Sequence, residues 1–464
     1  MSSISSSSSL LSPVDEHNGT RPQKQEGTTS VHPADETLKL GVEEMPMPMD
    51  SQEALQGFVE VCDNTNEDAI NVAMKEANAN TTPSSSSPGG EDGVVREGWY
   101  KRYCRWVPTS SVLLEQAEKR VLSYVKTVYE GRRVDIGAGE KRCKWSLWGK
   151  PEDRKVWTLV FNKTAEKTPI VIIHGLCASA GLWSLNIDAL AEGRPLYAID
   201  LIGFGRSSRP RFSTDAMEAE QQHVEAIEAW RKEMNLDRFV LLGHSMGGFI
   251  SASYALKYPE RVAHLVLADP WGFPAKPDNM ESILPAKKSI GVRVATTIGP
   301  YINPLGLVRA AGPMGPGLIA KVRPDLVSKF QALNQDGVAN IAEYIYHCNA
   351  QNPTGEEAFR TMMNLFGWAK NPMCNRIHEL NSAMPMTLMY GDNTWLPQIP
   401  EDDVKQMRPG ETHTEVHIVP HAGHHLYADN QNVFNSIVNK AASIADKLFH
   451  PHRFPVESNS KIMN

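Results

Sequence analysis

The chain has 464 residues, of which 41% are hydrophobic and 22% are charged, and its formal net charge is −7. This length and apolar content are sufficient for one large core, and the charge gives no indication of nucleic-acid binding. The six cysteines are scattered, and none forms a CxxC pair. This argues against a zinc site or a disulfide framework and favours reduced thiols in the cytosol.

The first 93 residues differ in composition from the rest. They contain 16 acidic and 4 basic residues, a net charge of −12, whereas the remainder carries +5. A segment so polar and acidic cannot bury enough apolar surface to offset its ordering entropy, so residues 1–93 are predicted to be disordered. We see no signal-peptide pattern, no transit-peptide pattern and no run of 18 apolar residues. We therefore expect a protein that is neither secreted nor membrane-spanning.

The stretch "REGWYKRYCRWVP" (96–108) interleaves aromatic and basic residues. On a helix Trp99, Tyr103 and Trp106 fall at i, i+4 and i+7 and share a face, with the basic residues towards the other side. This pattern suits the headgroup boundary of a bilayer or lipid droplet, so these three aromatics are predicted to form a lipid interface. The alternative is that they pack on the body of the domain.

Short apolar runs alternate with amphipathic segments through much of the remaining chain. The runs predicted to be strands are 157–161, 169–175, 195–201, 238–245, 262–270, 386–392 and 414–420. Helical patterns include 216–235, the segment after Ser245, and 430–448. Most of the runs are too uniformly apolar for a half-exposed sheet. The alternation predicts a mostly parallel, doubly wound α/β sheet with helices on both faces.

The alternation stops between residues 274 and 380, where Gly, Pro and apolar residues predominate. We interpret this stretch as an inserted helical cap. The predicted division of the chain is a tail (1–93), a lipid-interface segment with a helix (94–130), a first core segment (131–273), the cap (274–380), a second core segment (381–450) and a second tail (451–464).

The strongest motif is "GHSMGG", residues 243–248, which lies between an apolar strand and a helix. The pattern G-x-S-x-G in that context is typical of a nucleophile elbow, in which small residues allow a tight turn that exposes the serine. Ser245 is therefore the candidate nucleophile. A second motif, "IIHGLCASAGLW", places His174 and Gly175 after an earlier strand. The backbone N–H groups of Leu176 and Met246 are predicted to form the oxyanion hole.

The base is expected after the last strand, in "HIVPHAGHHLYAD" (417–429). His421, His424 and His425 are candidates, and we favour His424 because the preceding glycine permits a turn that points the ring across the sheet. His424 and Asp429 also form an H-x-x-x-x-D pattern, which is associated with acyl transfer to lysophospholipids. For Asp429 itself we favour a structural role, in which it caps the following helix.

Several phrases along the chain resemble the α/β-hydrolase-domain-containing 4/5 family. They are "EGWYKRYCRWVPTS", "ADPWGFP", "EYIYHCN", "GWAKNPM" and "HAGHHLYAD", and the resemblance spans about residues 96–450. It implies the α/β-hydrolase fold and a role in lipid metabolism. One branch of that family hydrolyses N-acyl and lyso-phospholipids. The other has lost the nucleophilic serine and is a lipid-droplet coactivator of a triglyceride lipase, to which lysophosphatidate acyltransferase activity has also been ascribed.

The presence of Ser245 resembles the hydrolytic branch, which keeps its nucleophilic serine. The phrase "YGDNTW" also resembles that branch, because Asn393 stands where the coactivator branch tends to carry Arg. The chain departs from the family at Pro397, the position that matches its usual catalytic aspartate. Two other carboxylates end predicted strands. We favour Asp392 as the orienting acid, with Asp269 as the alternative. The acidic residues 401–403 are further carboxylates and lie later in the same loop. A site without a functional acid is the remaining possibility.

The sequence thus predicts a serine lipase or acyl hydrolase for a lysophospholipid or N-acyl phospholipid, with acyl transfer as an implied further activity. No cofactor and no metal is expected. The expected location is the cytoplasm, at the surface of a lipid droplet or membrane, where a lipase or droplet-coat protein is a candidate partner. The rival function is a non-catalytic coactivator. A generic esterase or epoxide hydrolase ranks third, because epoxide hydrolases need an aspartate nucleophile.

Overall fold

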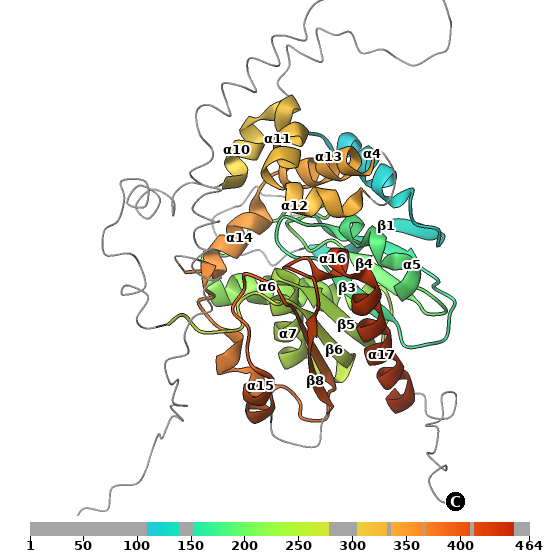
Figure 1. Ribbon diagram of the computed structural model, residues 1–464, viewed down its shortest axis with the longest axis vertical. Coiled ribbons are helices and arrows are strands. Elements are labelled where there is room, and N and C mark those ends of the chain that lie inside the picture. The colour runs from blue at the N-terminus through green and yellow to red at the C-terminus, as the bar shows by residue number, and fades with distance from the viewer. Residues whose placement is uncertain are drawn as a thin grey trace, which may run out of the picture. The chain divides into compact units, whose positions relative to one another are not determined.

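An eight-stranded sheet forms the centre of the computed structural model (Figure 1), which describes residues 109–138, 153–277, 304–331, 336–364, 367–408 and 413–449. The strands lie in the order β1-β2-β4-β3-β5-β6-β7-β8. Their bounds are β1 Tyr129–Ala138, β2 Asp153–Phe161, β3 Ile170–Ile173, β4 Leu196–Ile199, β5 Phe239–His244, β6 Val262–Ala268, β7 Met386–Gly391 and β8 Thr414–Val419. The predicted tails and the predicted interface residues Trp99, Tyr103 and Trp106 lie outside the described residues.

The sheet is mostly parallel, as predicted. β1 and β2 pair antiparallel, as do β2 and β4, and every further pair from β4 to β8 is parallel. Alternate residues of β3 enter different cores, because Ile170 and Ile172 pack in one apolar cluster while Val171 and Ile173 pack in the other. Strands buried on both faces require helices on both sides of the sheet, which explains their uniformly apolar sequences.

Helices cover each face of the sheet. α6 (Ala216–Glu233) and α7 (Met246–Lys257) contribute to one apolar cluster, and α17 (Gln431–Phe449) contributes to the other. α6 begins where the side chain of Asp215 accepts a hydrogen bond from the N–H of Glu218. Such a cap satisfies a backbone donor that the helix itself leaves free. The predicted helices 216–235 and 430–448 are thus confirmed within a few residues.

A group of helices follows β6 and precedes β7, where the inserted cap was predicted. They are α10 Pro304–Ala310, η3 Gly312–Met314, α11 Gly315–Val322, α12 Pro324–Val327, η4 Ser328–Phe330, α13 Gly337–Asn349, α14 Thr354–Met362, η6 Met373–Asn375 and η7 Ile377–Glu379. Figure 1 shows α10 to α13 gathered beside α4 (Ser111–Leu122) beyond one end of the sheet. α13 packs against both α4 and α11.

Shorter elements complete the described chain. They are η1 Ala180–Leu185, α5 Ile187–Leu190, η2 Pro259–Arg261, α15 Glu401–Met407 and α16 Leu426–Asp429. In the described residues, no helix is both long and apolar enough to cross a bilayer.

The strand β1 was not among the predicted strands. Its sequence "YEGRRVDIGA" carries four charged residues, and β1 lies at the edge of the sheet, where no other described strand pairs with its outer side. Edge strands tolerate such charges, which also discourage pairing with other chains. A search for apolar runs therefore misses this strand.

A buried ion pair fastens α17 to the segment before β4. Two guanidinium nitrogens of Arg194 lie 3.1 and 2.7 Å from the carboxylate oxygens of Asp446. The N–H of Thr168 donates to Asp446 at 2.9 Å, and Arg194 donates to the carbonyl of Thr168 at 2.7 Å. Both side chains are almost fully buried. Loss of one partner would leave the other charge buried without compensation.

We predict that Asp446→Ala lowers the free energy of unfolding by about 3 kcal/mol, because removing one member of a buried pair strands its partner. Urea denaturation followed by circular dichroism measures this loss. The control is Lys440→Ala, which breaks the pair between the exposed lysine and Glu415. That substitution should cost about 1 kcal/mol or less. Equal losses in the two variants would contradict the prediction.

Candidate active site

Ser245 lies in the turn between β5 and α7. Its backbone has φ 54° and ψ −122°, a conformation that residues with a side chain rarely adopt. The turn needs two glycines beside it. A Cβ on Gly243 would collide with the carbonyl of Gly247, and a Cβ on Gly247 would collide with the carbonyl of His174. These contacts give a physical reason for the spacing of the G-x-S-x-G motif.

His424 lies in the loop after β8, with its ring next to Ser245. Its Nε2 is 3.0 Å from Oγ of Ser245. The carbonyl of His424 accepts a hydrogen bond of 2.8 Å from Nε2 of His244, the residue before the serine. This bond ties the loop to the end of β5. Neither His421 nor His425, the other two candidates, has a hydrogen bond to Ser245 in the described structure.

The carboxylate at the ring of His424 belongs to Asp269. Its Oδ2 lies 2.6 Å from Nδ1 of His424, and the residue directly follows β6, the strand next to β5. Asp269 is fully buried and has a positive φ of 43°. This strained conformation turns its carboxylate towards the neighbouring strand ends. The three side chains Ser245, His424 and Asp269 thus form a continuous hydrogen-bonded chain.

Asp392, the acid favoured on sequence, does not contact the ring of His424. Its two oxygens accept hydrogen bonds from the N–H groups of His421 and Ala422 at 2.8 and 2.9 Å. These bonds lower the pKa of Asp392. The expectation that Asp392 orients His424 is therefore corrected. This exposed carboxylate is bonded to backbone N–H groups of the histidine loop, so it shapes that loop and does not reach the imidazole. The alternative, Asp269, has the required geometry.

Thr394 was not identified from the sequence as a site residue. Its hydroxyl lies 2.5 Å from Oδ2 of Asp269, the oxygen that also faces His424. Thr394 belongs to the loop after β7, in which Pro397 replaces the acid that the family resemblance implies. A lone threonine carries no recognisable pattern, so only the position of that loop beside β6 could have indicated its contact.

Burial controls the protonation of the pair formed by His424 and Asp269. It lowers the pKa of His424, and the positive charges of Arg323 and Lys329 act in the same direction. The ring is therefore neutral at neutral pH, the form that can accept a proton. Burial raises the pKa of Asp269, and the hydrogen bond from Thr394 opposes that rise. A carboxylate and an imidazole 2.6 Å apart are well placed to hold one proton between them.

The predicted oxyanion donors lie on both sides of Ser245. Met246 is the first residue of α7, and Leu176 follows the β3 turn at Gly175. A Cβ on Gly175 would lie 2.9 Å from Cβ of Ser245, which shows how closely this loop approaches the serine. Within the described residues, neither the N–H of Leu176 nor that of Met246 donates to another residue. Both amides are available for a ligand.

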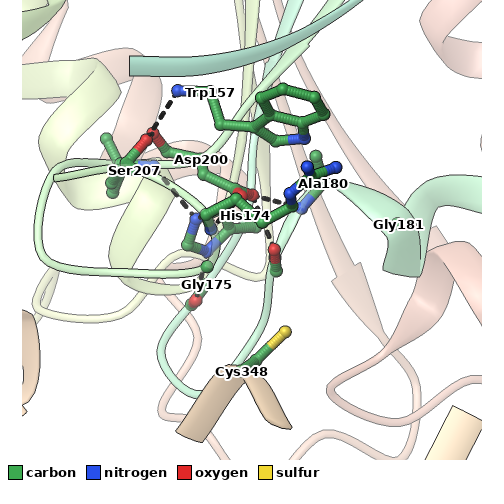
Figure 2. Close-up of polar contacts among 12 residues, drawn as sticks. Trp157, His174, Gly175, Ala180, Gly181, Asp200, Ser207 and Cys348 are labelled. Atoms are coloured by element: carbon green, nitrogen blue, oxygen red, sulfur yellow. Dashed lines mark hydrogen bonds and ion pairs between the residues drawn. The ribbon is translucent and has the colours of Figure 1, made fainter. Parts of the chain in front are cut away.

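A buried polar network supports the loop that carries Leu176. Nδ1 of His174 lies 2.8 Å from the carbonyl oxygen of Gly175. Nε2 of His174 accepts a hydrogen bond of 3.1 Å from the N–H of Leu201. Figure 2 shows His174 beside Asp200. One oxygen of Asp200 accepts hydrogen bonds from the rest of the loop, from the hydroxyl of Ser179 at 2.6 Å and the N–H of Ala180 at 2.7 Å. His174 is thus a structural residue of this loop.

The cap helix α13 also holds this loop. The hydroxyl of Tyr344 donates to Ser179 at 2.8 Å and accepts from the N–H of Gly181 at 3.0 Å. The side-chain amide of Asn349 donates to the carbonyl of Cys177 at 2.9 Å. Because Cys177 is next to Leu176 in the chain, α13 fixes the loop close to the predicted oxyanion donor.

Asp429 and His424 do not form the dyad that the H-x-x-x-x-D pattern implies. One oxygen of Asp429 accepts from the N–H of Gly423 at 3.0 Å, and the other lies 2.6 Å from the ammonium of Lys329. Nδ1 of His424 is already occupied by Asp269. Asp429 does not cap the following helix either, because the side chain of Asn430 accepts from the N–H of Val433. Asp429 instead links the histidine loop to the cap.

The arrangement is suited to acyl transfer through a covalent intermediate. A hydroxyl beside a neutral imidazole can be deprotonated as it attacks, and two free amides can stabilise the oxyanion that results. Among the described residues, no group of His, Cys, Asp and Glu side chains is arranged to hold a metal ion.

We predict that Tyr344→Phe slows labelling of Ser245 by a fluorophosphonate about 10- to 100-fold, because the loop beside the oxyanion donors loses two hydrogen bonds and shifts. Labelling rates measured by mass spectrometry test this. Tyr346→Phe is a matched control on the same helix, since the buried hydroxyl of Tyr346 has no hydrogen-bond partner among the described residues. That variant should label at the wild-type rate. Similar rates for Tyr344→Phe and the wild type would contradict the role of α13.

Comparison with known proteins gives the family. Residues 168–304 match the model of the alpha/beta hydrolase fold. The chain is 42% identical over 339 residues to the (lyso)-N-acylphosphatidylethanolamine lipase of Mus musculus, covering 73% of this chain and 94% of that protein. It is 40% identical over 357 residues to the 1-acylglycerol-3-phosphate O-acyltransferase ABHD5 of Homo sapiens, covering 76% and 97%. The chain therefore belongs to the α/β-hydrolase-domain-containing 4/5 family.

Proposed function

We propose that this protein is a serine lipase that cleaves the acyl group from a lysophospholipid or N-acyl phospholipid. The observation that supports a catalytic role is the chain of hydrogen bonds from Ser245 through His424 to Asp269, with distances of 3.0 and 2.6 Å. A non-catalytic coactivator would not need a serine, a neutral imidazole and a buried carboxylate in this order. Two amides beside the serine, without partners among the described residues, support the same role.

In the first half of the proposed reaction, Oγ of Ser245 attacks the acyl carbonyl carbon while its proton passes to Nε2 of His424. The amides of Leu176 and Met246 stabilise the oxyanion. The bond between the carbonyl carbon and the leaving oxygen then breaks, and the proton on Nε2 passes to that oxygen. Asp269 holds the ring in place and stabilises its positive charge.

In the second half, an acceptor hydroxyl attacks the acyl-enzyme and gives its proton to Nε2 of His424. The bond between the acyl carbon and Oγ of Ser245 breaks, and the proton returns to the serine. Water as acceptor completes hydrolysis. A hydroxyl of a lysophosphatidate as acceptor completes acyl transfer by the same steps. The additional acyltransferase activity therefore needs no dyad between His424 and Asp429.

A phosphate in the substrate is supported by the charges around the histidine. The leaving group takes its proton from His424, so it lies on the histidine side of Ser245. The positive charges of two cap residues, Arg323 and Lys329, act on His424 from nearby, and each of them is paired with a carboxylate, Asp325 and Asp429. Cations next to the leaving group favour an anionic one. The two relatives are named for an N-acylphosphatidylethanolamine and for an acylglycerol phosphate, which agrees with this.

We further propose that the exposed ring of Trp395 touches the lipid surface from which the substrate comes. The side chain is 57% exposed, and its ring centre lies 5.3 Å from that of His424. An exposed indole at the entrance of a site suits the boundary between water and acyl chains. We propose that Trp99, Tyr103 and Trp106, outside the described residues, serve the same surface.

The remaining features of the proposal follow from the family. We place the protein peripherally on a membrane or lipid droplet in the cytoplasm, with a lipase or droplet-coat protein as a candidate partner. The division into tails, two hydrolase-core segments and a cap over residues 274–380 is proposed with it. The alternative function, coactivation of a lipase without catalysis, rests on the family resemblance, in which one branch is a lipid-droplet coactivator.

We predict that the purified wild type reacts with a fluorophosphonate and releases fatty acid from lysophosphatidylethanolamine or N-acylphosphatidylethanolamine, and that Ser245→Ala and His424→Ala do neither. Asp269→Asn should lower kcat by about four orders of magnitude, because the neutral amide favours the wrong tautomer of the ring. Asp392→Asn should lower it far less, since Asp392 contacts only the backbone of the histidine loop and its neighbour Asn393.

Mass spectrometry of the labelled protein and of the released lipids provides both measurements. Melting temperatures of all variants verify that each is folded. A folded wild type that neither labels nor releases fatty acid in the presence of lipid would reject the enzyme and favour the coactivator. Equal activity on monoacylglycerol and on its phosphate ester would leave the enzyme intact but reject the phosphate preference.

We predict that Trp395→Ala lowers hydrolysis of lipid in vesicles at least about tenfold but changes hydrolysis of a soluble p-nitrophenyl ester less than about twofold, because only the first reaction needs contact with the surface. Hydrolysis of vesicle lipid by Trp395→Phe should lie between that of the wild type and that of Trp395→Ala. Ile418→Ala is the control, since that apolar side chain is 51% exposed but lies on the edge strand β8. Equal losses on both substrates would instead assign Trp395 to the acyl pocket.

A further inference from the structure

The loop after β7 carries no acid at Pro397, yet it still reaches the candidate triad. The hydroxyl of Thr394 lies 2.5 Å from Oδ2 of Asp269, and the same hydroxyl oxygen lies 3.2 Å from the N–H of Leu396. The N–H of Leu396 can only donate. The hydroxyl therefore accepts from Leu396, which leaves its single proton free to point at Asp269.

The backbone around Thr394 is fixed from two sides. The N–H of Asn393 donates to the carbonyl of Ala422 at 2.9 Å, and the N–H of Thr394 donates to the carbonyl of Gly391 at 3.3 Å. The first of these bonds joins the loop to the segment that carries His424. The threonine is thus held in register with both the histidine and its carboxylate partner.

Asp269 has few other donors. It is fully buried, and its Oδ1 has no hydrogen-bond partner within the described residues. Its Oδ2 is contacted by two polar side chains, Thr394 and His424. A buried carboxylate with so little support tends to take up a proton, because burial penalises its charged form. The hydroxyl of Thr394 bonds the charged form and so opposes the rise in the pKa of Asp269.

The charge of Asp269 decides which ring nitrogen of His424 carries the hydrogen. A carboxylate accepts the hydrogen of Nδ1 and leaves Nε2 free to accept the proton of Ser245. A protonated Asp269 would donate to Nδ1 instead, and the hydrogen of the ring would then sit on Nε2. The ring would face Ser245 with a donor, which cannot act as a base.

We propose that Thr394 is the positioning residue that keeps Asp269 charged and so sets the reactive tautomer of His424. In this arrangement the loop after β7 supports an acid on the neighbouring strand in place of supplying the acid itself. The inference rests on the proposed hydrolysis and names a residue that acts through Asp269 without touching the substrate.

The test compares Thr394→Val, which keeps the shape but removes the hydroxyl, with Thr394→Ser, which keeps the hydroxyl. Rates are measured on a soluble p-nitrophenyl ester across the acid and neutral range of pH. We expect Thr394→Val to lower kcat about 10- to 100-fold, the usual range for a hydrogen bond to a charged group, with little change in KM. Thr394→Ser should retain most of the wild-type kcat.

The pH profile separates this role from a merely structural one. Activity is lost as the pH falls and the pair of Asp269 and His424 takes up a proton. Removing a donor to the charged carboxylate raises its pKa, so the acid limb of kcat in Thr394→Val should move to higher pH by about one unit. In Thr394→Ser the limb should stay in place.

Thr354→Val is the matched control, because the hydroxyl of Thr354 is buried in the cap without a hydrogen-bond partner among the described residues. It should match the wild type in kcat and pH profile. Equal losses in Thr394→Val and Thr394→Ser with an unmoved acid limb would reduce Thr394 to a packing residue and overturn the proposal. A wild-type kcat and pH profile for Thr394→Val would overturn it as well.

A second measurement does not depend on turnover. The low-field proton resonance of the ring N–H of His424, assigned by its absence in His424→Gln, should titrate at higher pH in Thr394→Val than in the wild type. If the wild type hydrolyses no ester, the proposed function fails while this titration still decides the role of Thr394. If the wild type is active and the titration is the same in both proteins, Thr394 fails and the enzyme stands.

Discussion

The buried carboxylate of Asp269 is the group on which the rest of the site depends. It is cut off from water, and only one of its oxygens has partners in the described structure. A charge in that environment persists only when donors are aimed at it. The hydroxyl of Thr394 and the ring of His424 are those donors. Hydrogen bonds of Asp392 and Asn393 to the backbone of Ala422 hold the loops after β7 and β8 together beside them.

Strand order explains why the acid can sit on β6. β5, β6, β7 and β8 are consecutive and parallel, so their carboxyl ends lie in one row. The serine follows β5 and the histidine follows β8, and an acid between them can come from either of the two intervening strands. Asp269 reaches the ring from β6 through a backbone turn of positive φ, whereas Asp392 on β7 is used to shape the histidine loop.

Sequence reasoning predicted the sheet correctly from its apolar runs. It also singled out Ser245, from two glycines around a turn, and His424, from a histidine loop after the last strand, and the structure brings these two side chains together. Sequence reasoning favoured Asp392 over Asp269, whereas the structure places Asp269 at the ring, because both residues end a strand and only the paths of the following loops decide which carboxylate meets the ring. Thr394 gave no signal, since one hydroxyl has no pattern. The strand β1 was missed because an edge strand does not have to be apolar.

The helices between β6 and β7 contribute side chains that reach both sides of the candidate site. Tyr344 and Asn349 hold the loop beside Leu176, and Lys329 holds Asp429, whose other oxygen binds the backbone N–H next to His424. A shift of these helices would therefore move the loop beside Leu176 and the loop beside His424 in the same event. Coupling of this kind needs only packed helices and a few buried hydrogen bonds that have one arrangement when the cap is seated.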